Sequence, residues 1–519
     1  MSESLGVNYL PSHAGPAFWR DFRPDEIATD LEALAGQGVG YVRAFVMWTD
    51  FMPTPERVEP EMLERLAAFA GLVGDAGLRL QLTLLVGHMS GQNFPPPWLE
   101  DPAELYRDPA LLDLQARFVG ELVASVKEAP CVDSYVLTNE GTRFMGDAPA
   151  ADVESWARRL YAAVKDVDAD HPVMLGDGAW WALGEVNGFA ATHAQDAVGL
   201  HLYLSDTDPE RLVAGHGLAV GVAAALAGGK DVWLEEFGAP HSSFGEEEVA
   251  AWAGKVATEA RMQGATRVCW WCAFDFNLPE QDPYRHHAFE MTFGMLRADR
   301  SARPVAAALR EATDAPLPEL PEASLLVPSH LLRHYPFADV DRDVTTRALR
   351  NAYAALRRLG YLPRVVLEEA LGSGDAVPDI LVVPSAQKLL AASWEALERH
   401  PGTLIFSYSH GPSAPYGAWS HRTREFFGGR PRNRPGLAED APRYVVMGDR
   451  TVWFHETEQF AATPLLIEPE EGEVLGTDQQ GRPMLLRVGR RFMLLYPLEA
   501  VAHDPRPVEK LYGFVLEGA

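Results

Sequence analysis

The sequence contains few cysteines. Its 519 residues include only three, Cys131, Cys269 and Cys272, too few for the disulfide framework of a small secreted protein. Cys269 and Cys272 have the spacing of a redox pair, but both fall on one predicted strand, where positions three apart lie on opposite faces. We therefore expect buried thiols and a reducing, cytoplasmic location.

Long apolar runs and positive charge are also scarce. No run of 18 apolar residues occurs, so no membrane-spanning helix is expected, and the N-terminal residues lack the basic-then-apolar pattern of a secretion signal. The 45 Lys and Arg residues are outnumbered by 73 Asp and Glu residues, which gives a net charge of −28. Because so acidic a surface repels phosphate groups, we expect neither nucleic acid nor a membrane as a partner.

The remaining composition is that of a folded protein of several domains. Hydrophobic residues make up 47% and charged residues 23%, which are globular values. At about 150 residues per domain, the length predicts two to four domains.

Eight β-rich apolar runs alternate with helical patterns in the first part of the chain. The runs cover residues 5–10, 40–46, 78–86, 132–137, 172–175, 197–202, 231–234 and 267–274. Asp208-Pro209 is typical of a helix start between two of them. The alternation predicts a (β/α)8 TIM barrel. The alternative, an open doubly wound sheet, needs a glycine-rich phosphate turn after the first strand, and residues 11–16 do not form one.

A proline-rich stretch at residues 315–321 predicts a linker. Strand and helix patterns alternate again beyond it, and short strands with turns and no helix follow from about residue 438. We therefore predict three domains: a barrel at 1–314, an α/β domain at 322–432 and a small β domain at 433–519.

Polar and aromatic residues stand at the ends of the predicted strands, where the loops of a barrel form a shared mouth. These residues are Arg43, His88, Asn139, Glu140, His201, Tyr203, Glu236 and Trp271. Glu140 and Glu236, the two carboxylates of this set, end the fourth and seventh predicted strands, so we expect them to face each other across the mouth. Such a pair suits cleavage of a glycosidic bond, with one carboxylic acid and one nucleophile or base.

At these residues the sequence resembles the retaining clan of (β/α)8 glycoside hydrolases, most closely family 5. The resemblance implies that Glu140 is the acid/base, that Glu236 is the nucleophile and that Asn139 holds the sugar 2-hydroxyl. It also implies that Arg43, His201, Tyr203 and Trp271 line the sugar site; His88, as a neighbour of the third strand, is a further candidate contact. Strict strand alternation predicts that Glu235 points away from Glu236.

The α/β part resembles the amidotransferase-like domain of family 42 β-galactosidases. The resemblance rests on residues 359–363, 379–385 and 402–406, and it implies a flavodoxin-like domain that builds a trimer and precedes a small β domain. An amidotransferase needs a nucleophilic cysteine, and all three cysteines precede residue 273, so we expect no catalysis there.

These expectations describe a retaining exo-β-glycosidase of short oligosaccharides, a β-mannosidase before a β-galactosidase or a β-glucosidase. The alternative is a non-catalytic carbohydrate-binding barrel. We expect no cofactor and no metal ion, and a homo-oligomer that is a trimer by resemblance.

Overall fold

The structure is a computed structural model that describes residues 4–176, 194–332, 342–371, 379–386, 388–408, 423–431, 442–453 and 467–518. The described chain divides into two compact units. The N-terminal unit comprises residues 4–176, 194–203 and 226–317, and the C-terminal unit comprises residues 204–225 and the described residues from 318 onward.

The N-terminal unit is built on eight parallel strands, which confirms the predicted barrel. In spatial order they are β7 (Val173–Met174), β6 (Val132–Thr138), β3 (Arg79–Val86), β2 (Tyr41–Met47), β1 (Leu5–Asn8), β10 (Ala265–Trp270), β9 (Asp231–Phe237) and β8 (Ala197–His201). The first and last strands nearly meet, because the N–H of Asp196 donates to the carbonyl oxygen of Val173 at 2.8 Å.

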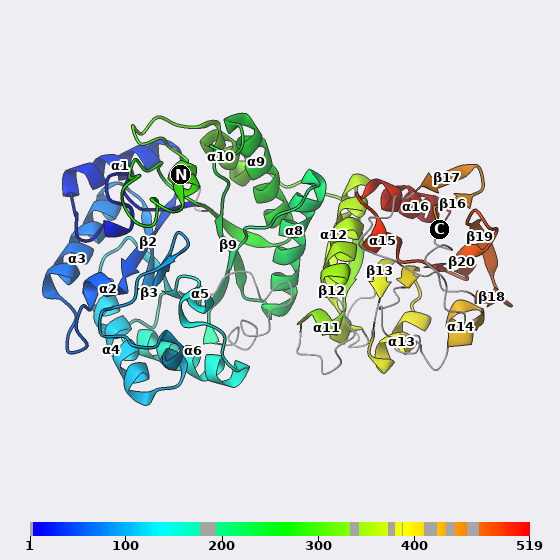
Figure 1. Cartoon of the computed structure of the whole chain (residues 1–519), viewed down its shortest axis with the longest axis horizontal. Helices are drawn as coiled ribbons and strands as arrows, with labels where there is room; N and C mark the ends of the chain where they lie inside the picture. Colours follow the sequence, from blue (N-terminus) through cyan, green and yellow to red (C-terminus); the bar gives the residue numbers. More distant parts are fainter. Residues whose placement is uncertain are drawn as a thin grey trace. The chain divides into compact units, whose positions relative to one another are not determined.

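Figure 1 shows helices around the outside of these strands. The longer ones of this unit are α1 (Pro24–Gly36), α3 (Pro60–Asp75), α4 (Pro109–Val126), α6 (Ala150–Lys165), α9 (Glu246–Met262) and α10 (Pro304–Asp314), and the short α2 (Trp48–Phe51) and α5 (Gly141–Met145) follow strand ends. Several begin with proline, and Asp108 caps α4 by accepting from the N–H groups of Ala110 and Leu111 at 2.9 Å.

The barrel interior holds large side chains next to glycines. A Cβ at Gly6 would lie 2.1 Å from the ring of Tyr41, and one at Gly199 would lie 2.5 Å from Oε2 of Glu235. Tyr41 and Glu235 are both fully or almost fully buried. These glycines therefore leave room inside the barrel for two bulky side chains, Tyr41 and the charged Glu235.

The C-terminal unit contains one nine-stranded mixed sheet. Its order is β12 (Leu362–Leu367), β11 (Glu322–Val327), β13 (Ile380–Ala386), β14 (Thr403–Tyr408), β21 (Arg491–Leu494), β20 (Pro483–Val488), β19 (Glu473–Thr477), β16 (Tyr444–Met447) and β17 (Arg450–Trp453). In this spatial order, the first five strands, from β12 to β21, pair in parallel. The pairs from β21 onward, through β20, β19 and β16 to β17, are antiparallel. The strands expected for the α/β part and for the β part thus share a single sheet.

Helices also belong to this unit. They are α8 (Pro209–Leu226), whose last residue lies in the N-terminal unit, α11 (Ser329–Leu332), α12 (Arg342–Arg358), α13 (Ala391–Glu398), α14 (Thr423–Phe427), α15 (Leu498–Val501) and α16 (Arg506–Glu517). The Asp208 side chain caps α8 as predicted, accepting from the N–H groups of Glu210 and Arg211. The expectation of no helix after residue 438 is wrong, because α16 buries Val508, Leu511 and Val515 at helical spacing.

A carboxylate is buried in the C-terminal unit. Glu499 accepts hydrogen bonds from Tyr512 at 2.7 Å, from Ser407 at 2.5 Å and from Ser385 at 3.1 Å. Burial raises the pKa of Glu499 even though these hydroxyl groups favour its charged form. The network joins the ends of β13 and β14 to α15 and α16.

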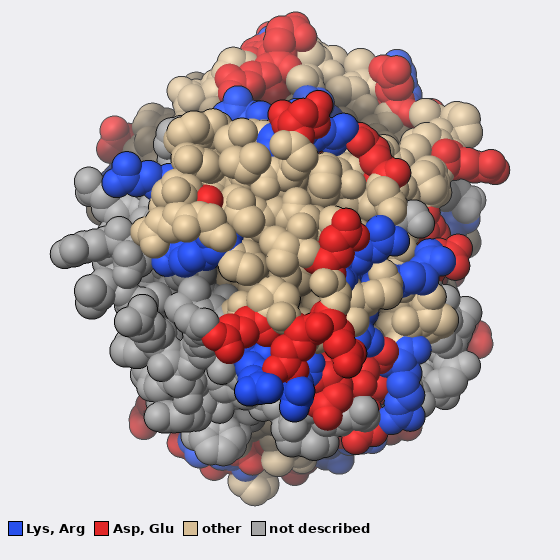
Figure 2. All heavy atoms as spheres, turned by 90° about the vertical axis from the view of Figure 1, so that its right-hand side faces the viewer, with Lys and Arg blue, Asp and Glu red and all other residues tan. Residues whose placement is uncertain are grey.

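The outer strands of this sheet expose apolar side chains. Trp453 on β17 is 58% exposed, and Val446 and Val474 on the neighbouring strands are also exposed. Figure 2 shows the face at the right-hand side of Figure 1, where a broad area without charged side chains is bordered by acidic and basic ones.

All three cysteines are buried and unpaired. No helix in the described part of the chain is long and apolar enough to cross a membrane.

Candidate active site

The carboxyl ends of the barrel strands bring the predicted site residues together. All but one of the eight touch another member by a hydrogen bond or ion pair: Arg43, His88, Asn139, Glu140, His201, Tyr203 and Glu236. The eighth, Trp271, lines the same cavity.

Arg43 is the fully buried centre of this cluster. Its guanidinium donates to Oε2 of Glu236 at 2.9 Å and to Oδ1 of Asn139 at 2.9 Å. Further donations reach Asn8 and Thr83. The other oxygen of Glu236 accepts from the hydroxyl of Tyr203 at 2.8 Å. Both oxygens of Glu236 therefore face donors, an arrangement that satisfies a carboxylate.

Glu140 is placed by an unusual backbone conformation. It follows β6 with φ 50° and ψ 54°, in the left-handed region, and its N–H donates to the carbonyl oxygen of Gly176 at 2.7 Å. Non-glycine residues occupy this region at a cost, and such residues cluster at functional sites. The conformation directs the Glu140 carboxyl toward His201, whose Nδ1 lies 3.1 Å from Oε1.

His201 bridges three carboxylates. Its Nδ1 lies 3.1 Å from Glu140 and 3.5 Å from Glu236, and its Nε2 lies 3.2 Å from Glu235. Burial alone would lower the pKa of His201, but the charge of Glu236 and the hydrogen bonds to Glu140 and Glu235 raise it to about 10. At neutral pH His201 is therefore an imidazolium that donates from both nitrogens.

The two facing carboxyl groups titrate as a pair. Burial raises the pKa of Glu236, and the charge of Glu140 acts in the same direction. Burial also acts to raise the pKa of Glu140, but the hydrogen bond from His201 and the charges of His201 and His88 hold it below its usual value. Because the groups interact strongly, the pair retains one proton to a higher pH than an isolated carboxyl would.

Glu235 is a site residue that the sequence reasoning missed. The strand alternation predicted for it is wrong, because the pairing of β8 with β9 shifts between Leu200 and His201 and turns both Glu235 and Glu236 toward His201. Glu235 also accepts from Gln81 at 3.0 Å. Burial acts to raise its pKa, but Arg43 and His201 bring the value below the usual range, so Glu235 is a fixed anion.

His88 lies on a small hairpin of β4 (His88–Met89) and β5 (Gln92–Asn93). Its Nδ1 lies 2.7 Å from Oδ1 of Asn93, its carbonyl oxygen accepts from Asn139 at 2.9 Å, and its Nε2 lies 3.9 Å from Glu140. The hairpin thus supports Asn139, and its His88 lies nearer to Oε2 of Glu140, whereas His201 contacts Oε1.

A cavity of about 410 Å³ opens onto both facing carboxyl groups, within the size range of small-molecule sites. Its lining residues are His88, Met89, Ser90, Gly91, Asn139, Glu140, Arg143, Tyr203, Glu236, Trp271, Phe289, Glu290 and Phe293. Of these, Arg143, Phe289 and Glu290 had no signal in the sequence, since they stand on a short helix and on a loop beyond the strand ends.

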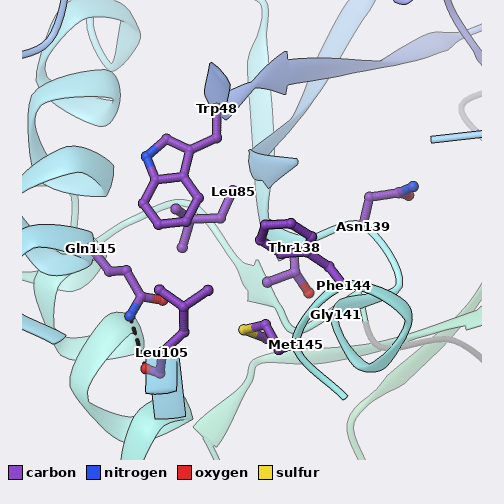
Figure 3. Close-up of a pocket in the computed structure, with 9 residues that line it drawn as sticks. All are labelled: Trp48, Leu85, Leu105, Gln115, Thr138, Asn139, Gly141, Phe144 and Met145. Atoms are coloured by element: carbon purple, nitrogen blue, oxygen red, sulfur yellow. Dashed lines mark hydrogen bonds between the residues drawn. The ribbon is translucent and has the colours of Figure 1, made fainter. Parts of the chain in front are cut away.

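A second, much smaller cavity lies beneath Asn139 and α5. Figure 3 shows its lining, with Trp48, Leu85 and Met145 pointing inward and Gln115 bonded to the carbonyl oxygen of Leu105. Its volume of about 10 Å³ admits one water molecule at most, so it is a packing gap near the end of β6 and not a sugar site.

Glu140, His201 and Glu236 are also the trio in the described chain whose ligand atoms could surround a metal ion, within 4.8 Å of one another. An imidazolium has no free lone pair, so His201 fits a metal ion poorly in this protonation state.

No family model and no curated protein matches the chain. Solved structures do. The chain is similar to the exo-β-1,4-mannosidase of Opitutaceae bacterium strain TAV5, with a TM-score of 0.82 and 23% identity over 99% of this chain and 95% of that one. It is also similar to a GH5_18 variant of Streptomyces cattleya in complex with Manβ1-4GlcNAc. The TM-score is 0.64, with 24% identity over 73% of this chain and 98% of that one.

A third similar structure is the β-galactosidase of the haloarchaeon Halorubrum lacusprofundi, with a TM-score of 0.70 and 16% identity over 99% of this chain and 89% of that one. The chain therefore has the fold of a (β/α)8 glycoside hydrolase. The mannosidase and the β-galactosidase share the architecture of nearly the whole chain, with the sheet-rich C-terminal region included.

Proposed function

We propose that the protein is a retaining exo-β-glycosidase that releases a terminal sugar from short β-linked oligosaccharides, with β-mannosides as the preferred class. The supporting observation is the close approach of Glu140 and Glu236, which have carboxylate oxygens within 4.8 Å of each other. Retaining enzymes hold their carboxyl groups about 5–5.5 Å apart, whereas inverting enzymes leave room for a water molecule at about 6.5–9.5 Å.

In this mechanism Glu236 attacks the anomeric carbon while Glu140 gives its proton to the leaving oxygen. A covalent glycosyl-enzyme forms. Water then attacks its anomeric carbon, and Glu140 takes a proton from that water. Arg43 and Tyr203 donate to the two oxygens of Glu236, as a nucleophilic carboxylate requires. The pKa is raised for Glu236 and lowered for Glu140 in the free site, so the mechanism requires the retained proton to pass to Glu140 when the substrate binds. Asn139, fixed by Arg43 and the His88 carbonyl, would bind the sugar 2-hydroxyl.

The substrate class rests on the likeness to the exo-mannosidase and to the GH5_18 complex with Manβ1-4GlcNAc. A β-galactoside is the second candidate, because the likeness to the Halorubrum enzyme also extends over 99% of the chain. The domain bounds 1–314, 322–432 and 433–519, a trimeric assembly and a cytoplasmic location also belong to this proposal.

Replacing the two carboxyl groups tests the proposal. Glu236→Gln and Glu140→Ala should each lower hydrolysis of a nitrophenyl β-mannoside by about 100- to 10,000-fold, because nucleophile and acid/base are lost in turn. Azide should restore part of the Glu140→Ala activity and release a β-mannosyl azide, since azide attacks the glycosyl-enzyme without a general base.

Glu247→Gln, an exposed carboxylate on α9, is the matched control and should leave the rate unchanged. Full activity of either site variant would exclude this mechanism. Sugar binding without hydrolysis by the unaltered protein would favour the carbohydrate-binding alternative.

A further inference from the structure

One carboxyl group in the cavity has no part in the mechanism above. Glu290 lies on the 3₁₀ turn Ala288–Thr292, in the long loop after β10, and lines the cavity together with Glu140 and Glu236. The double displacement needs two carboxyl groups, so the third requires its own explanation.

Glu290 is held at one oxygen and open at the other. The indole Nε1 of Trp271 donates to its Oε2 at 3.1 Å. Within the described part of the chain, no hydrogen bond reaches its Oε1. Trp271 is itself buried and packs edge-to-face on Phe45 at 6.0 Å between ring centroids. The indole therefore fixes the carboxyl group and leaves one oxygen for a ligand in the cavity.

The loop that carries Glu290 is anchored on both sides. The ring Nδ1 of His287 lies 3.0 Å from the carbonyl oxygen of Ser90, the N–H of Phe276 donates to Met291 at 3.0 Å, and the N–H of His241 donates to Thr292 at 2.8 Å. A carboxyl group positioned this firmly loses little freedom when a ligand binds.

The neighbouring charges affect the protonation state of the Glu290 carboxyl group. Burial raises the pKa of Glu290 to about 7; the charges of Glu236 and Glu140 act in the same direction, and the indole hydrogen bond opposes them. A hydroxyl group suits such a carboxyl, because a hydroxyl can donate to the ionised form and accept from the protonated one.

We propose that Glu290 is a specificity-determining residue that binds a hydroxyl group of the sugar whose anomeric carbon lies between Glu140 and Glu236. This inference rests on the proposed glycosidase function and adds a contact outside the catalytic pair. A substrate that lacks the hydroxyl, or presents it on the other face of the ring, leaves the carboxyl unpaired and binds less well.

Glu290→Gln tests the inference, since glutamine keeps the shape and the acceptor for Trp271. Above the pKa of about 7, where Glu290 is ionised, we expect KM for the nitrophenyl β-mannoside to rise about 10- to 100-fold with kcat nearly unchanged, as for loss of a hydrogen bond to a charged group. At lower pH the difference should shrink, because the amide donates to the hydroxyl as the protonated carboxyl does. A series of monodeoxy β-mannosides locates the hydroxyl: the analogue without it should bind the variant and the unaltered protein equally well. Glu247→Gln is the control.

Two results overturn the inference. One is an unchanged KM in Glu290→Gln for every substrate. The other is a penalty of the same size for every deoxy analogue, which indicates a purely structural role.

Titration calorimetry with methyl β-mannoside separates this inference from the proposed function. If the unaltered protein hydrolyses no glycoside, the proposed function is wrong, yet weaker binding by Glu290→Gln still supports the contact. Equal binding by both proteins, or no binding by either, overturns it.

Discussion

His201 balances the charges of the site at the residue scale. It stands between Glu140, Glu235 and Glu236, and its imidazolium is the second cation of the cluster beside Arg43. Without it, two buried carboxylates would lose a charged donor, and such groups are costly to leave unpaired.

This arrangement predicts a pH-dependent contribution to stability. The pKa of His201 is raised from 6.5 to about 10 in the folded chain, so its stabilisation is fully present below pH 6.5 and is lost as the pH rises through about 10. The difference in melting temperature between the unaltered protein and His201→Gln should therefore be largest near pH 6 and shrink toward pH 10. The exposed His286, changed to glutamine, should show no such trend; a constant difference for His201→Gln would contradict the assignment.

Residues at strand ends were predictable, and residues in loops were not. Arg43, Asn139, Glu140, His201 and Glu236 follow from the rule that barrel strands end at one mouth. Glu235 was misplaced because a register shift is set by neighbouring strands and leaves no local trace in the sequence. Glu290 depends on how a long loop folds back over the mouth, which no periodicity encodes.

At the scale of elements, the barrel strands depend on glycines that face charged side chains. Gly199 on β8 leaves room for the Glu235 carboxylate on β9, and an added Cβ would lie 2.5 Å from its Oε2. Glu235 is fixed by Gln81, Arg43 and His201, so it cannot move without moving them.

Gly199→Ala should therefore displace the Glu235–His201 contact and lower kcat at least about tenfold while the barrel still folds, because misplaced catalytic groups cost rate steeply. Gly71→Ala on α3 is the matched control. No atom lies within 4 Å of its added Cβ, so it should keep full activity and gain about 0.5–1 kcal/mol of stability. Steady-state kinetics and thermal unfolding check both; normal kcat in Gly199→Ala would show that the strand tolerates the methyl group.

The elements themselves were mostly readable from the sequence. All eight barrel strands lie where apolar β-rich runs predicted them, because buried parallel strands are continuously apolar. The joining of the later strands into one nine-stranded sheet was not predictable, since β14 pairs with β21 across more than eighty residues of chain. The helix α16 did carry a signal in Val508, Leu511 and Val515, which the strand-rich surroundings obscured.

At the scale of the whole molecule, the charge of −28 constrains assembly. Copies of so acidic a chain repel one another, so surfaces of low charge favour association. The exposed side chains of Val446, Trp453 and Val474 on the outer strands offer such a surface.

Under the proposed trimeric assembly, light scattering should give a mass of three chains of 57.0 kDa. The assembly should be favoured by salt, because screening shortens the range of repulsion to about 8 Å at about 0.15 M. A mass of one chain at all salt concentrations would exclude the trimer, and Trp453→Arg should weaken association if the outer strands form the contact.

The grouping of residues 204–225 with the C-terminal unit has a consequence for biosynthesis. Within that unit, Glu210 pairs with Arg358 at 2.7 Å, and Arg211 donates to the carbonyl oxygen of His503. The ribosome makes this segment long before either partner emerges, although N-terminal domains usually fold first. We therefore expect α8 to reach its final packing only after the C-terminal unit has been made, and a chain that ends in the linker would lack both of these contacts.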